Sequence, residues 1–165
     1  MSKKLVIDSS VIILLSRRGK LEQYLKQKKN EGYDVLIPQA ISKELIDEPR
    51  QLVKEIRKQS PALAEKITRS IEEISASIDR DLIKVENIDY RRYSEIIDNV
   101  RKHLSQLEAK KEHTIKKGDP ELIVLTIQLY DRFKETIFVS TKDKGLLRAL
   151  EPFRDKVEYE ILENP

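Results

Sequence analysis

The chain has 165 residues, of which 37% are charged and 39% hydrophobic, and its net charge is +3. This length is typical of one domain with a substantial core, so we expect residues 1–165 to form a single domain. The chain has no cysteine, which excludes disulfides and thiolate metal sites, and no apolar run long enough for a membrane span or signal peptide. We therefore predict a cytoplasmic location and no membrane partner.

Short apolar runs alternate with helix-like stretches along the chain. In chain order, the predicted strands are residues 4–7, 35–37, 83–85, 136–140 and 157–162. The predicted helices beside them are residues 10–29, 40–48 and 120–134. Gly19 is expected to break the first helix, and Pro49 to interrupt the second. The alternation predicts an α/β fold whose parallel sheet is covered by helices on both faces.

The middle of the chain has a different pattern. Apolar residues recur there at steps of three or four, at Leu63, Ile67, Ile71, Ile74 and Ile78, and again at Ile96, Val100, Leu104 and Leu107. This spacing predicts two amphipathic helices, at roughly residues 50–80 and 89–115. We expect a helical-hairpin extension, or subdomain, at roughly residues 50–115 on the edge of the sheet. Its apolar stripes would form core or, if the pair protrudes, a dimer face or a clamp on a substrate.

Four acidic residues stand where predicted strands end or helices begin. Asp8 follows the first strand, Glu44 lies shortly after the second, Asp119 opens a helix, and Asp143 comes after the fourth strand. In an open parallel sheet the carboxyl ends of the strands share one crevice, and ligands bind there. Clustered carboxylates repel each other unless a cation neutralises them, and oxygen ligands suit hard cations. The pattern therefore predicts a Mg²⁺ or Mn²⁺ site.

Each acid also has an ordinary structural explanation. Asp8 and Asp119 are suited to cap the helices that follow them, and Pro120 fits the first turn of a helix. Glu44 could be an exposed helical residue, and residues 141–145 a turn between strand and helix. These explanations account for each acid singly but not for their shared placement.

Basic residues occur in several short clusters, which are usually a solvated surface with acids interspersed. The candidates for phosphate contacts are the lysines nearest the acids, namely Lys116, Lys117, Lys142 and Lys144. An acidic metal pocket with lysines at its rim suits a polyanionic substrate. The two histidines, His103 and His113, fall in the helical region and are interpreted as surface or packed residues.

Four motifs carry a resemblance to a known family along nearly the whole chain. They are Val6-Ile7-Asp8-Ser9-Ser10, Ile37-Pro38-Gln39-Ala40-Ile41-Ser42-Lys43-Glu44-Leu45, Lys117-Gly118-Asp119-Pro120-Glu121-Leu122 and Val139-Ser140-Thr141-Lys142-Asp143-Lys144-Gly145-Leu146. In this order, with helical sequence between the second and third, they resemble the PIN (PilT N-terminus) domain family. That family has a metal-dependent ribonuclease fold, and many members are VapC-like toxins paired with an antitoxin protein.

The resemblance implies a role for each matching residue. The four acids would hold Mg²⁺ or Mn²⁺ and carry the catalysis, and the ion would activate a water for in-line attack on an RNA phosphate. Ser10 and Thr141 would orient carboxylates or water, and Glu121 would add a carboxylate at the rim. The four lysines named above would contact RNA. An antitoxin and a second copy of the chain are the expected protein partners.

Two other classes of protein share some of these features. A PIN-like module could bind RNA or a protein without cleaving, although a pure binder gains nothing from four acids facing phosphate. A phosphohydrolase of the haloacid-dehalogenase type also has an Asp after its first strand, but it needs a second Asp where this chain has Ser10. The chain has no G-x-x-x-x-G-K-[ST] motif, which argues against a P-loop nucleotide enzyme.

Overall fold

The computed structural model describes residues 2–108 and 118–162. Five strands form one parallel sheet in the order β3-β2-β1-β4-β5. They are β1 (Lys3–Ile7), β2 (Tyr33–Pro38), β3 (Lys84–Glu86), β4 (Ile137–Ser140) and β5 (Tyr159–Ile161). The predicted α/β fold with a parallel sheet is confirmed. All five predicted strands are present, and their ends differ from the prediction by no more than two residues.

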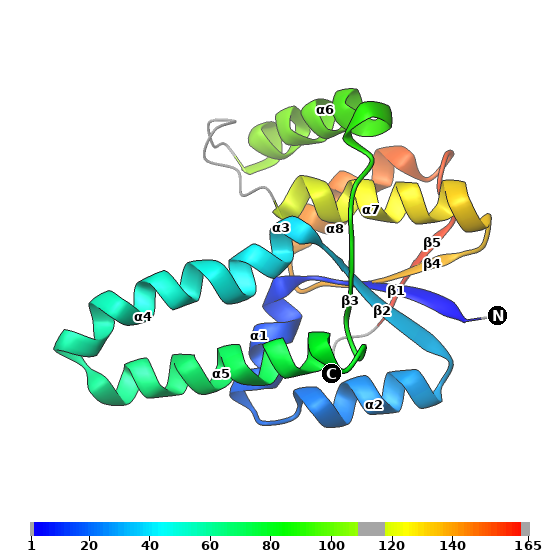
Figure 1. Ribbon diagram of the computed structural model, residues 1–165. Helices are drawn as coiled ribbons and strands as arrows, with labels where there is room; N and C mark the ends of the chain where they lie inside the picture. Colours follow the sequence, from blue (N-terminus) through cyan, green and yellow to red (C-terminus); the bar gives the residue numbers. More distant parts are fainter. Residues whose placement is uncertain (1, 109–117, 163–165) are drawn as a thin grey trace.

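Helices cover both faces of this sheet (Figure 1). One face carries α1 (Ser9–Arg17), α2 (Leu21–Asn30) and α5 (Pro61–Asp79), which pack against one another. The other face carries α7 (Gly118–Phe133), which crosses β2, β1 and β4, together with α6 (Tyr90–Glu108) and α8 (Lys144–Leu150). Two short helical segments lie between these elements: α3 (Gln39–Ser42) follows β2, and the 3-10 turn η3 (Glu151–Phe153) precedes β5.

The centre of the sheet explains the apolar run at the end of the first strand. β1 lies between β2 and β4, and Leu5, Val6 and Ile7 are fully buried. A central strand with helices on both faces has no solvent side, so it shows a continuous apolar run instead of alternation. The predicted break at Gly19 is confirmed, because α1 ends at Arg17 and Gly19 has a φ of +66°. Glycine adopts this left-handed conformation without steric cost.

The prediction that Pro49 interrupts the second helix is wrong. The helix runs on from α3 through a π-helical turn, η1 (Lys43–Asp47), into α4 (Glu48–Gln59). Pro49 is the second residue of α4 and directly follows this π-helical turn. The wider turn before it, in which the Glu48 N–H reaches back to the Lys43 carbonyl, accommodates the proline without ending the helix.

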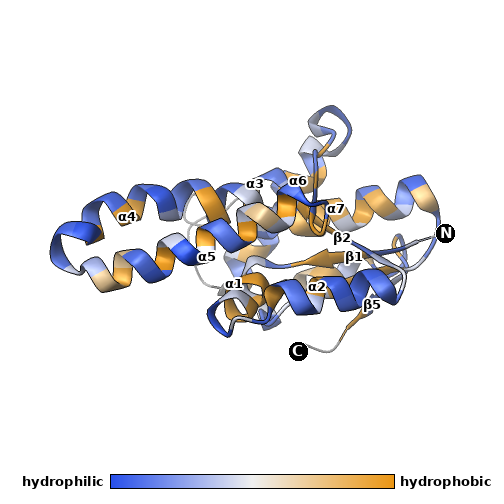
Figure 2. Ribbon diagram, turned by 60° about the horizontal axis from the view of Figure 1, so that its bottom comes forward, coloured by the Kyte–Doolittle hydropathy of each residue, from blue (hydrophilic) through white to orange (hydrophobic). Residues whose placement is uncertain are grey.

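The helical-hairpin extension is formed by α4 and α5, which project from the body of the protein (Figure 1). Figure 2 shows that α4 consists mostly of hydrophilic residues, whereas hydrophilic and hydrophobic residues alternate along α5. A small separate core of Val53, Ala64 and Ile71 holds the two helices together. The middle of α5 contacts α1, where the Ser16 hydroxyl lies 2.8 Å from the Ser70 hydroxyl.

The second amphipathic stretch of the middle region lies elsewhere. Helix α6 packs on α7 and α8, on the opposite face of the sheet from α5. The Tyr93 hydroxyl donates to Asp131 of α7 at 2.6 Å, and Val100 and Leu104 enter the main core. The stripes at residues 63–78 and 96–104 therefore pack in different layers, so the hairpin is formed by α4 and α5 alone and α6 is not part of the predicted extension at residues 50–115. Within the described parts of the chain, no helix is long and apolar enough to cross a membrane.

An ion pair at the amino edge of the sheet predicts a pH-dependent contribution to stability. The Lys4 ammonium lies 2.7 Å from Asp34, and Lys84 lies 3.6 Å from it. Burial raises the pKa of Asp34, but the hydrogen bonds from Lys4 and Ser2 and the charges of both lysines outweigh it, leaving the pKa below its ordinary value of 3.8. The folded state therefore favours the charged form, which stabilises the fold above that pH.

We expect Asp34→Asn to lower the free energy of unfolding at pH 7 by up to about 1 kcal/mol, because water partly screens the pair. The difference from the wild type is expected to shrink as the pH falls from 3.8 through the lower pKa of the folded state, below which Asp34 is protonated in both states. Urea unfolding at several pH values measures it. A difference that stays constant down to pH 2 would assign the effect to packing.

Candidate active site

The strands leave a crevice at the carboxyl edge of the sheet. β1 and β4 are neighbours, yet the chain leaves β1 into α1 on one face and β4 into α8 on the other (Figure 1). Such a divergence opens a crevice in parallel α/β sheets, and ligands bind there. Asp8 directly follows β1, and Asp143 follows β4 by three residues, so both acids stand at this crevice.

Asp8 accepts three hydrogen bonds shorter than 3 Å and is only 4% exposed. Its Oδ1 accepts from the Ser9 N–H at 2.7 Å, and its Oδ2 accepts from the Ser10 and Thr141 hydroxyls, both at 2.9 Å. The bond from Ser9 caps α1, as the structural explanation of the sequence predicts. These donors satisfy the hydrogen-bonding capacity of a nearly buried carboxylate and fix its orientation.

Thr141 connects Asp8 to Asp143. Its hydroxyl donates to Asp8 and accepts the Asp143 N–H at 3.0 Å, and the residue is 2% exposed. The Asp143 Oδ1 accepts from the N–H groups of Gly145 and Leu146, at 2.8 and 3.3 Å, and so caps α8. Both acids at the crevice are thus helix caps whose rotamers are fixed by backbone donors.

Glu44 approaches the same crevice from the π-helical turn. Its Oε2 lies 3.5 Å from the Ser9 hydroxyl, which also lies 3.4 Å from Asp8. Its Oε1 accepts the N–H of Gly118, the first residue of α7, at 3.1 Å. Asp119 comes next, in the first turn of α7 rather than before it. The four acids predicted from strand ends therefore lie along one edge of the sheet.

The carboxylates do not form a complete set of ligands for one metal ion. Among the described residues, no three Asp, Glu or His side chains are near enough together to hold one metal ion. The donor chemistry nevertheless fits Mg²⁺ or Mn²⁺, which take oxygen ligands. Mg²⁺ usually keeps several waters and binds through one or two carboxylates together with substrate phosphates. Neighbouring carboxylates on rigid helix caps are compatible with that mode, with Asp8 and Asp143 as the best-fixed candidates.

The basic residues predicted for RNA are placed only in part. Lys142 and Lys144 flank Asp143 and are exposed, so their ammonium groups can reach a phosphate at the crevice. Lys116, Lys117 and His113 lie outside the described residues. His103 is thirteen residues beyond the start of α6, about 20 Å along that helix from the pocket described next.

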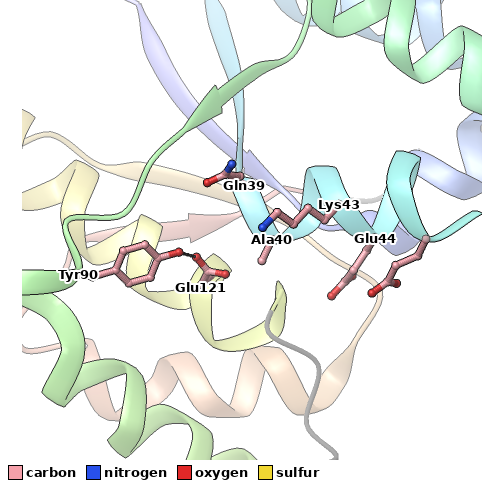
Figure 3. A pocket seen from close by; sticks show the side chains of 7 residues that line it. Gln39, Ala40, Lys43, Glu44, Tyr90 and Glu121 are labelled. Carbon is pink, nitrogen blue, oxygen red and sulfur yellow. Dashed lines mark hydrogen bonds between the residues drawn. The ribbon is translucent and has the colours of Figure 1, made fainter. Parts of the chain in front are cut away.

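A pocket beside the crevice contains a residue that the sequence reasoning missed. It has a volume of about 440 Å³, and its walls include Glu44, Glu121 and Tyr90. Glu121 is 5% exposed and accepts a hydrogen bond from the Tyr90 hydroxyl (Figure 3). This bond, burial and the carboxylate charge raise the pKa of Tyr90 to about 12, so the hydroxyl stays protonated at neutral pH. No motif in the sequence singles out Tyr90, which directly precedes the basic pair Arg91 and Arg92.

Comparison with known families agrees with this arrangement. A sequence model of the Halobacterial PIN domain matches residues 1–161. The chain therefore belongs to the PIN domain family, and the resemblance noted in the sequence is confirmed. A search of curated proteins gives no match. PIN domains are typically nucleases that use divalent metal ions and generally act on RNA.

Proposed function

We propose that the protein is a metal-dependent endoribonuclease, in which Asp8, Glu44, Asp119 and Asp143 form the catalytic acidic group. One observation carries the proposal. A chain of hydrogen bonds runs from Asp143 through Thr141 to Asp8, and the Ser9 hydroxyl lies between Asp8 and Glu44. Aligning carboxylates along one crevice costs electrostatic free energy, and a bound cation facing a phosphate recovers it.

The contacts of each residue indicate its role in the proposed reaction. Asp8 and Asp143 would hold a Mg²⁺ or Mn²⁺ ion, because backbone and hydroxyl donors already fix their orientation. Ser10 and Thr141 donate to Asp8 and would keep its carboxylate in position to hold that ion. A bound ion supplies water activation and neutralises charge on the leaving oxygen. Lys142 and Lys144 attract the RNA backbone by charge.

Metal removal is the direct test. We expect the purified chain to cleave a mixed panel of RNAs with Mg²⁺ or Mn²⁺ and to lose all cleavage in EDTA, because the carboxylates alone neither activate a water nor neutralise the leaving oxygen. Gel analysis of labelled RNA measures the cut. Activity must return when metal is restored in excess over EDTA. Cleavage that continues in EDTA would overturn the metal dependence.

RNA binding without cleavage under every metal would favour the alternative of a non-cleaving PIN-like module. The toxin role, the antitoxin partner and the dimer stay predictions from the resemblance. Growth arrest on expression of the wild-type chain, and not of an Asp143→Asn chain, would support the toxin role. Normal growth with a fully active enzyme would instead favour an RNA-processing role.

A further inference from the structure

We propose that the pocket beside the acidic crevice is a subsite for one unpaired base of the RNA substrate, with the Tyr90 ring as its stacking surface. This inference rests on the proposed function, because it names the form of RNA that the site accepts. An enzyme that seats a base in a pocket requires that base to be unstacked, so the substrate would be single-stranded at the cut.

The pocket has the size and position for a base next to the cut. Its volume of about 440 Å³ falls within the range of roughly 300–1,000 Å³ that small-ligand pockets occupy. Glu44 lies on its wall and also belongs to the acidic network through the Ser9 hydroxyl. A base seated in the pocket therefore has its sugar and phosphate directed toward the crevice.

Tyr90 is exposed and yet rigidly held. The residue is 52% exposed, while its hydroxyl is bound to the buried Glu121 (Figure 3). The turn before it is fixed to α7 by Gln128, whose side chain accepts the Asp89 N–H at 2.8 Å and donates to the Asn87 carbonyl at 2.9 Å. A ring that is already ordered loses little entropy when a base stacks on it, which favours binding.

The charge of the pocket favours a base over a phosphate. Glu44, Glu48 and Glu121 line it, so a second phosphate would be repelled, whereas a neutral base is not. Carboxylates accept hydrogen bonds from the amino groups of adenine, cytosine or guanine, and uracil has no amino group. Lys43 is exposed on the same wall and can pair with the backbone of a strand that enters.

A simpler explanation is that Tyr90 only ties α6 to α7 through its hydroxyl. That role needs the hydroxyl and not an exposed ring face, so two substitutions separate the explanations. Tyr90→Phe removes the hydroxyl and keeps the ring, whereas Tyr90→Leu removes both. Phe133, which is 36% exposed at the far end of α7, offers the matched control Phe133→Leu.

The first measurement is the Kd for fluorescent ten-nucleotide single strands by anisotropy in EDTA, where no cleavage occurs. We expect Tyr90→Leu to weaken binding roughly 5- to 100-fold, and Tyr90→Phe and Phe133→Leu to change it less than about threefold. Oligo(A) and oligo(C) are expected to bind more tightly than oligo(U). The subsite would be overturned if Tyr90→Leu and the wild type bound with equal affinity. It would also be overturned if Tyr90→Phe and Tyr90→Leu lost the same amount of affinity.

The second measurement uses a tryptophan reporter. The chain contains no tryptophan, so Tyr90→Trp introduces a single tryptophan at the proposed surface, which can be excited apart from the tyrosines. Stacking of a base is expected to quench its emission on addition of single-stranded RNA, while Phe133→Trp stays unchanged. Quenching without cleavage under any metal would retain the subsite and reject the nuclease. Cleavage that needs Asp8, with no quenching at position 90, would retain the nuclease and reject the subsite.

Discussion

Asp8→Asn is expected to lower the rate of RNA cleavage on the order of 10³-fold, which corresponds to about 4 kcal/mol of lost transition-state stabilisation. Asn has nearly the same shape as Asp, and the Ser10 and Thr141 hydroxyls at 2.9 Å can rotate to suit an amide. The fold is therefore retained while the negative charge that attracts a cation is lost. Cleavage rates at saturating Mn²⁺, together with thermal unfolding, measure both effects.

The matched control is Asp155→Asn. Asp155 is an exposed acid just before β5, at the opposite edge of the sheet from the crevice, and its substitution removes the same charge. We expect this variant to keep wild-type activity. Equal activity of Asp8→Asn and the wild type would reject Asp8 as a catalytic residue and reduce it to a cap of α1. A joint loss of activity and folded structure would show that the carboxylate is needed first for stability.

The sheet was predictable because burial leaves a strong pattern. Leu5, Val6 and Ile7 can be buried on both sides only in a central strand, and Gly19 marks a turn that other residues enter at a cost. The continuation of the helix past Pro49 was not predictable. A π-helical turn depends on how α3 packs against α7 and α4 against α5, and no local spacing encodes those contacts.

The positions of the acids at the strand ends were predictable from the sequence. Parallel strands bring their carboxyl ends together, so the residues after β1 and β4 had to be neighbours once the sheet was parallel. The residues that contact those acids could not be predicted from the sequence. The approach of Glu44 to Gly118 joins residues 74 positions apart, and Tyr90 meets Glu121 across 31 positions. Such contacts depend on the packing of α6 and η1 against α7, which a single sequence does not reveal.

Gly118→Ala is expected to lower cleavage at least tenfold without destabilising the protein. A Cβ at Gly118 would lie 2.9 Å from Glu44 Cδ and closer still to its Oε1, so the carboxylate must move away. The Glu44 side chain is flexible at its end, and alanine suits the first turn of a helix better than glycine. The free energy of unfolding should therefore change by less than about 1 kcal/mol, while the bond from the Gly118 N–H to Glu44 is lost. Activity assays and urea unfolding of one preparation measure both quantities.

Gly32→Ala is the control variant in which stability is expected to fall while activity is kept. Gly32 has a φ of +91° with no atom within 4 Å of an added Cβ, and it lies at the amino edge of the sheet, before β2. This variant is expected to lose about 1 kcal/mol of stability through backbone strain and to keep its activity. The two glycine variants thus separate stability from catalysis in opposite directions. If Gly118→Ala keeps full activity, the position of the Glu44 carboxylate against α7 does not matter for cleavage, and Glu44 has to be removed from the catalytic acids.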